Sequence, residues 1–150
     1  MHRREFMHVT LGAGAAIAAA PSLLRALEAP VKMTVYKSAS CGCCKDWVKY
    51  MEGQGFTATV KDMDDLSGIK RSSGVPVKLE SCHTALVGGY VIEGHVPADL
   101  VKKILAEKTE IVGLAVPGMP VDAPGMGNGK TPYDVIAWDK AGKTSVFAKR

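Results

Sequence analysis

Four cysteines carry most of the potential chemistry in this sequence, and three of them stand within four residues. Cys41, Cys43 and Cys44 form the motif Cys-Gly-Cys-Cys, and Cys82 follows far along the chain. Cys41 and Cys44 have the C-x-x-C spacing of a redox-active dithiol at the start of a helix. Two thiols suffice for disulfide exchange, whereas a soft metal would use three or four. The spacing therefore leaves both disulfide exchange and metal binding open.

Structural disulfides are a third interpretation of the same cysteines. An even number of cysteines in an exported chain ordinarily indicates a structural disulfide framework. The clustering argues against it here, because adjacent Cys43 and Cys44 can pair only through a strained ring. We therefore expect a metal or redox site.

The first 29 residues have the composition of an export signal. Arg3 and Arg4 precede an apolar, Gly/Ala-rich run over residues 9–20, the layout of a secretory signal. The arginine pair followed by Phe6 resembles the bacterial twin-arginine signal; an ordinary secretory signal that contains two arginines is the alternative. The run is also shorter than the ~20 residues that span a bilayer. We expect residues 1–29 to be removed, which would leave residues 30–150 in the periplasm without stable membrane insertion.

Length and charge limit the function classes that remain. The part after the signal has the size of one compact domain. The whole chain carries 19 Lys and Arg against 15 Asp and Glu, a net charge of +4. No stripe of Lys and Arg with interleaved aromatic residues is present in the sequence, so we expect no nucleic-acid partner.

The order of predicted elements indicates an α/β fold. Apolar alternation predicts strands at 31–36 and 56–61, separated by a helix over 43–54 and followed by a short helix at 64–71. Gly88-Gly89 between two apolar runs predicts a tight hairpin, and Pro97 opens a further helix. This order is that of a single thioredoxin-like domain, with the C-x-x-C at the start of its first helix.

The last forty residues add a loop and a hairpin to that domain. From 113 to 132 the sequence is rich in Gly, Pro, Ala and Val, with Met119 and Met126 each preceded by Pro-Gly. We expect a long ordered loop, because such segments in small domains are usually functional or disordered. Strands at 133–138 and 144–148 should then form a C-terminal hairpin.

The position of Cys82 favours metal binding over disulfide exchange. In glutaredoxins a Val-Pro pair, with a cis-proline, stands before the Gly-Gly turn and contacts the cysteine motif. Aligned on Gly88-Gly89, Cys82 takes the place of that valine and His83 the place of the proline. Cys82 should therefore face Cys41 and Cys44, which gives a cluster of up to four sulfurs.

The ligand types indicate which metal such a cluster would bind. Thiolates suit Cu(I), zinc or an iron–sulfur cluster. Cu(I) fits an exported protein best, and the thioethers of Met119 and Met126 would add copper ligands but do little for zinc. His83 and His95 are further candidate ligands, with loop or capping roles as the alternative.

Three motifs resemble those of the CopG-like family of exported, thioredoxin-fold copper-resistance proteins. They are Cys-Gly-Cys-Cys, the run from Ser81 to Pro97, and the loop with its two Pro-Gly-Met units. The resemblance spans roughly residues 32–150. It implies a multinuclear, cysteine-bridged copper cluster at Cys41, Cys43, Cys44 and Cys82, with a role in copper redox handling and, as partners, other periplasmic copper-resistance proteins. A thiol-disulfide oxidoreductase and a zinc or iron–sulfur module remain as alternatives.

Overall fold

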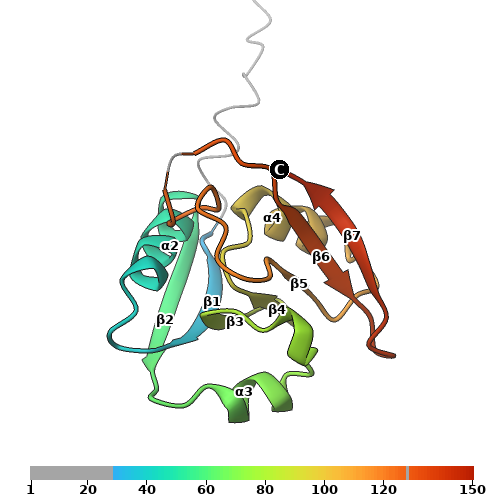
Figure 1. The fold of residues 1–150 in the computed structure, drawn as a ribbon, viewed down its shortest axis with the longest axis horizontal. Helices are drawn as coiled ribbons and strands as arrows, with labels where there is room; N and C mark the ends of the chain where they lie inside the picture. Colours follow the sequence, from blue (N-terminus) through green and yellow to red (C-terminus); the bar gives the residue numbers. More distant parts are fainter. Residues whose placement is uncertain (1–28, 128) are drawn as a thin grey trace, which may run out of the picture.

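The computed structural model describes residues 29–127 and 129–150, which form a mixed α/β fold around a seven-stranded sheet (Figure 1). The expected signal segment therefore lies outside the described residues, except for Ala29. Within the described residues, no helix is both long and apolar enough to cross a membrane. The strands are β1 (Val31–Lys37), β2 (Phe56–Asp62), β3 (His83–Val87), β4 (Tyr90–Glu93), β5 (Gly113–Ala115), β6 (Asp134–Trp138) and β7 (Thr144–Lys149). The helices are α2 (Gly42–Gly53), α3 (Ser67–Ser72) and α4 (Ala98–Glu107), with a 3₁₀ turn at Val77–Leu79.

The sheet order is β2-β1-β3-β4-β5-β6-β7. β1 and β2 run parallel, and α2 is the crossover that a parallel pair requires. β3 is antiparallel to both β1 and β4, whereas β5 runs parallel to β4. This topology puts the start of α2 at the end of β1, beside the point where β3 begins.

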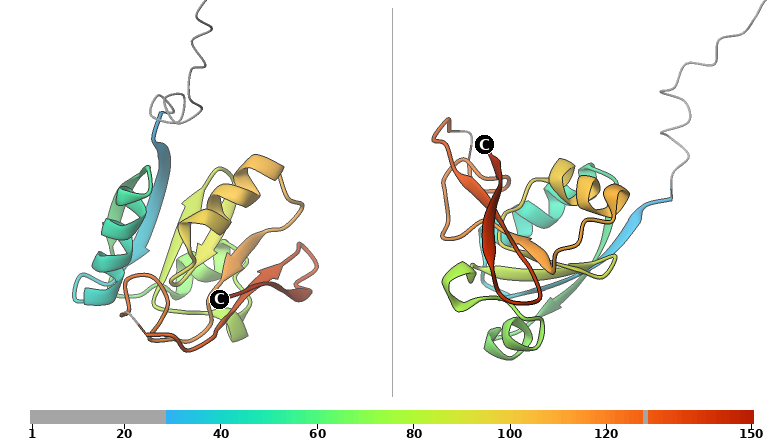
Figure 2. Two further views of the ribbon diagram at one scale, coloured as in Figure 1. Left: turned by 90° about the horizontal axis from the view of Figure 1, so that it is seen from above. Right: turned by 90° about the vertical axis from the view of Figure 1, so that its right-hand side faces the viewer.

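Helices cover the two faces of the sheet unequally, as Figure 2 shows. α2 and α4 lie on one face and enclose the main hydrophobic core with inward side chains of β1, β3 and β4. α3 and the 3₁₀ turn lie on the other face, where Val75 and Leu79 pack with Trp138 in a second core. The alternation of side chains along β3 therefore sends His83 and Ala85 to the main core and Leu86 to the second.

α2 is amphipathic in the manner its sequence predicts. Cys44, Trp47, Val48 and Met51 are its buried residues, and their spacing places them on one helical face. The predicted bounds differ from the observed ones by a single residue at each end. Gly55, at a φ of 90°, ends the turn that leads into β2.

The β3–β4 hairpin is confirmed. Val87 pairs with Tyr90 across a two-residue turn, and Gly88 and Gly89 have φ values of 55° and 87°. Positive φ at both central residues is the geometry that favours Gly-Gly in such hairpins. The hairpin fixes the register that brings Thr84 opposite Glu93.

The C-terminal part needs one correction. Residues 113–115 were expected to belong to a loop, but they form β5, paired with β4 and β6. Gly113 permits this pairing, because a Cβ there would lie 2.0 Å from the carbonyl oxygen of Val91 and 2.5 Å from the Trp138 ring. The predicted C-terminal hairpin is present as β6 and β7. Between β5 and β6, residues 116–127 and 129–133 contain no helix or strand.

Candidate metal centre

The start of α2 is built on a cysteine. Cys41 is the N-cap residue, and its Sγ accepts a hydrogen bond from the Cys44 amide N–H at 3.3 Å. Cys41 and Cys44 are joined in a disulfide, whereas Cys43 is a free, half-buried thiol. The Sγ atoms of Cys41 and Cys43 are 3.6 Å apart. A sulfur at this position accepts from free helical N–H groups, which favours its thiolate form when it is reduced.

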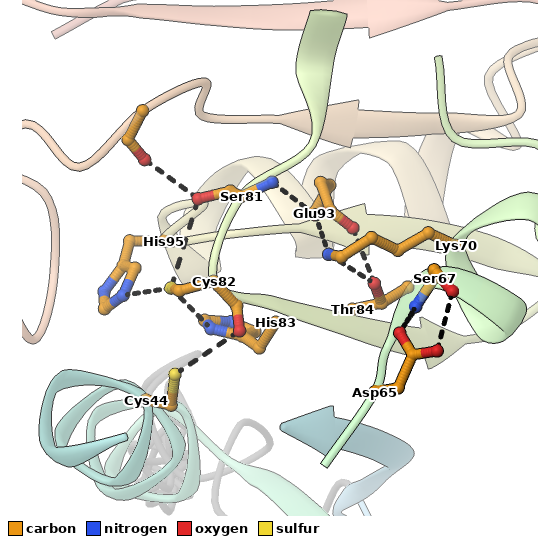
Figure 3. A network of polar contacts seen from close by, with 11 residues as sticks. Cys44, Asp65, Ser67, Lys70, Ser81, Cys82, His83, Thr84, Glu93 and His95 are labelled. Atoms are coloured by element: carbon orange, nitrogen blue, oxygen red, sulfur yellow. Dashed lines mark hydrogen bonds and ion pairs between the residues drawn. The ribbon is translucent and has the colours of Figure 1, made fainter. Parts of the chain in front are cut away.

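Cys82 adds a fourth sulfur to those of Cys41, Cys43 and Cys44. It directly precedes β3, whose first residue, His83, pairs with Lys37 at the end of β1. The Cys44 Sγ lies 3.8 Å from the Cys82 carbonyl oxygen, as Figure 3 shows from close by. The sulfurs of Cys41, Cys43, Cys44 and Cys82 all lie within 4.8 Å of one another. The structure thus brings together the four cysteines that the sequence singled out.

The two free thiols differ in their surroundings. The pKa of the Cys82 thiol is raised to about 11, chiefly by burial and in addition by the neighbouring Cys43 thiol. Cys82 is therefore a protonated thiol at neutral pH in the absence of a metal. A soft metal ion would displace that proton, because metal binding requires the thiolate.

Two imidazoles also approach the Cys82 sulfur. The Cys82 Sγ lies 3.3 Å from His83 Nδ1 and 3.2 Å from His95 Nε2. These three side chains form a second group whose ligand atoms lie within 4.8 Å of one another. Cys82 belongs to both groups, so it links the sulfur cluster to the imidazoles.

Both histidines are buried. The His83 ring lies against Trp47, with 4.4 Å between ring centroids, and 5.1 Å from the His95 ring. Burial lowers the pKa of His83 well below its usual range and also lowers the pKa of His95. Among the described residues, His83 Nε2 has no hydrogen-bond partner. Both imidazoles are therefore neutral at pH 7, the form in which histidine binds metals.

The two loop methionines lie in different environments. Met119 is 59% exposed, whereas Met126 is partly buried against the main core. Their segment is attached to the site at two points, through Ser81 Oγ to the Gly118 carbonyl at 2.8 Å and through His95 Nδ1 to the Pro124 carbonyl at 2.6 Å. The loop thus closes over the imidazole side of the site.

A buried polar network beside Cys82 was not predicted from the sequence. Lys70 and Glu93 form an ion pair in which both side chains are buried, and Thr84 and the Ser81 amide also bind the Glu93 carboxylate. In the sequence, this network was indicated only by Glu93 itself, a charged residue that ends an apolar strand. Its partner could not be inferred, because Lys70 is 23 residues away in the sequence.

Comparisons with known proteins indicate the family to which the chain belongs. Residues 79–126 match the family described as "Protein of unknown function, DUF411". Two solved structures, described as "Copper resistance protein copG" forms 1 and 2, are each 43% identical to the chain, with a TM-score of 0.76. Each match covers 81% of this chain and 98% of the solved one. No curated protein matches. On identity and coverage together, the chain belongs to the family of the copper resistance protein CopG.

Proposed function

We propose that this protein binds Cu(I) through Cys41, Cys43, Cys44 and Cys82 and serves copper resistance or homeostasis. The observation that carries the proposal is the convergence of the four sulfurs within 4.8 Å. Thiolates are soft ligands that select Cu(I) over hard cations. The matched structures are described as copper resistance proteins, which supports copper over zinc or an iron–sulfur cluster as the metal.

The geometry favours more than one copper ion. Four thiolates this close can each bridge two metal ions, whereas two thiolates can only chelate one. Reduction of the Cys41–Cys44 disulfide, which takes two electrons and two protons, would make all four sulfurs available. His83, His95, Met119 and Met126 are proposed as additional ligands, with the two histidines better placed because both contact Cys82.

The same cysteines could change the oxidation state of copper. Two thiols can reduce two Cu(II) ions to Cu(I), which forms one disulfide and releases two protons. Cys41 and Cys44 are the pair suited to this step, because they are joined in a disulfide here. Redox cycling of copper is therefore part of the proposal.

The fold and location complete the proposal. The order β2-β1-β3-β4, with α2 and α4 on one face, supports a thioredoxin-like core to which β5, β6 and β7 are added. Residues 1–29 are proposed to direct export to the periplasm, by the twin-arginine route, before removal. Other periplasmic copper-resistance proteins are the proposed partners.

Copper titration tests the function. Anaerobically reduced protein, spanning residues 30–150, is titrated with Cu(I) in competition with a chromophoric chelator. We expect saturation at more than one copper per chain, and a lower stoichiometry in Cys43→Ser. Saturation at one copper, unchanged in Cys43→Ser, would refute the multinuclear site. No measurable Cu(I) binding would refute the function.

A thiol-disulfide oxidoreductase is the second candidate, and the Cys41–Cys44 disulfide at a helix start favours it. Such an enzyme needs an accessible nucleophilic thiolate, whereas here Cys43 and Cys82 crowd the dithiol. Insulin reduction with and without stoichiometric Cu(I) separates the two functions. Turnover near background in the copper-loaded protein supports the copper function, and robust turnover that copper does not change supports the oxidoreductase.

A further inference from the structure

Glu93 holds the chain on both sides of Cys82. Its carboxylate accepts a hydrogen bond from the Ser81 amide at 2.6 Å and another from Thr84 Oγ1 at 2.7 Å. Ser81 directly precedes Cys82, and Thr84 follows it by two residues. Figure 3 shows both contacts converging on Glu93, with Cys82 beside them.

The sheet alone does not fix this stretch of chain. β3 begins at His83, and its pairing with β4 begins at Thr84 opposite Glu93. Cys82 and Ser81 therefore lie just beyond the ladder. The backbone bond from Gly94 N–H to the His83 carbonyl, at 2.9 Å, is the last one on this side of the hairpin, and the Glu93 side chain then supplies the acceptor for Ser81.

Lys70 balances the charge of this carboxylate. The Lys70 ammonium contacts Glu93 Oε1 and lies 3.2 Å from Thr84 Oγ1. Lys70, Thr84 and Glu93 are at most 5% exposed. A buried ion pair adds little to stability compared with well-packed apolar residues, so stability alone is a poor reason for placing one here.

We propose that Glu93, supported by Lys70, is a positioning residue that sets where the Cys82 sulfur lies relative to the three cysteines of α2. Glu93 is not itself a ligand; it acts through the backbone of Ser81 and the side chain of Thr84. This inference rests on the proposed copper function, because it assigns Glu93 a part in the affinity of that site. Substitution of residues that orient metal ligands in this way commonly lowers the metal affinity by about 10–100-fold.

Two double variants separate the effect of the hydrogen bonds made by residue 93 from the effect of the charges of Lys70 and Glu93. Lys70→Met/Glu93→Gln removes both charges but keeps an amide oxygen for the Ser81 N–H and an N–H for Thr84 Oγ1. Lys70→Met/Glu93→Leu removes the charges and the acceptor together. We expect the Gln variant to keep its Cu(I) affinity within about threefold of the wild type, and the Leu variant to lose at least about tenfold.

A second readout needs no copper. In the reduced, metal-free protein, the rate of Cys82 alkylation is followed by peptide mass spectrometry, with Cys43 as the internal reference. We expect the Leu variant to change the Cys82 rate at least about threefold and the Gln variant to leave it unchanged. Leu114→Ala, a buried change in β5, is the control for lost stability and should alter neither the affinity nor the Cys82 rate.

The outcomes are distinct. Equal affinity and equal Cys82 reactivity in the Gln and Leu variants would overturn the inference. If the Leu variant does not fold, Glu93→Asp replaces it: this change keeps the charge but shortens the side chain, and wild-type values for both readouts would again overturn the inference. Failure of the wild type to bind Cu(I) refutes the function instead, and the alkylation rates still test the positioning.

Discussion

The imidazole of His95 connects Cys82 to the loop that covers the site. Its Nε2 lies 3.2 Å from the Cys82 Sγ, and its Nδ1 lies 2.6 Å from the Pro124 carbonyl oxygen. A carbonyl can only accept, so Nδ1 carries the proton of the neutral ring. Nε2 therefore presents its lone pair toward the sulfur, where it can accept from the thiol or bind a metal.

Replacement of His95 should weaken copper binding. We expect His95→Phe, which keeps a ring but loses both nitrogens, to lower the Cu(I) affinity about tenfold. His95→Gln is the matched variant, because its amide can still donate to Pro124. If the His95→Gln variant binds Cu(I) with the wild-type affinity in chelator competition, His95 acts by holding the loop and is not a ligand.

Cys82→Ser should lower the Cu(I) affinity at least about tenfold, or about 1.4 kcal/mol, and leave the fold intact. Cys82 is the one cluster cysteine that does not come from the start of α2, since it directly precedes β3, and its sulfur contacts both imidazoles. Chelator competition measures the affinity, and circular dichroism checks the fold. A variant that binds copper as the wild type does would show that Cys82 is not a ligand.

The Cys41–Cys44 disulfide should limit copper binding. It leaves two free thiols, Cys43 and Cys82, so oxidised protein should bind fewer Cu(I) ions than reduced protein. The measurement is a Cu(I) titration before and after treatment with a dithiol reductant, with free thiols counted in each state. Equal stoichiometry in both states would exclude the disulfide as a control on binding.

Gly125 should be intolerant of a side chain. A Cβ there would lie 2.6 Å from the Trp47 backbone nitrogen, and a helix backbone cannot move aside cheaply. Gly118 is the matched control, since it has a similar positive φ but open space around it. We expect Gly125→Ala to cost about 1–3 kcal/mol more unfolding free energy than Gly118→Ala in urea. Equal costs would mean that the loop does not pack on α2 in solution.

Local patterns were sufficient to predict most of the elements. The apolar stripe of α2 and the Gly88-Gly89 turn each depend on neighbouring residues, so the sequence revealed both. β5 was missed because three apolar residues carry no recognisable period, and its formation depends on packing of Gly113 against Val91 and Trp138.

For the site too, the features set by local sequence could be predicted, whereas the contacts between distant residues could not. The register implied by Gly88-Gly89 was enough to bring Cys82 toward Cys41 and Cys44. The contact between Lys70 and Glu93 could not be predicted, because it joins a short helix to a strand across the second face of the sheet. Nor could the sequence separate the exposed Met119 from the partly buried Met126, since both occur in the same Pro-Gly-Met context.

The contact between Trp47 and His83 gives the protein an intrinsic fluorescent reporter. The indole is buried against the imidazole, with its Nε1 bonded to the Val96 carbonyl at 3.0 Å. Trp138, the other tryptophan, lies in the second core. Chemical changes at Cys82 and His83 should therefore quench or shift the emission of Trp47 alone, and a Trp47→Phe variant would isolate the reference signal of Trp138. Events at the site can thus be followed in real time without any added label.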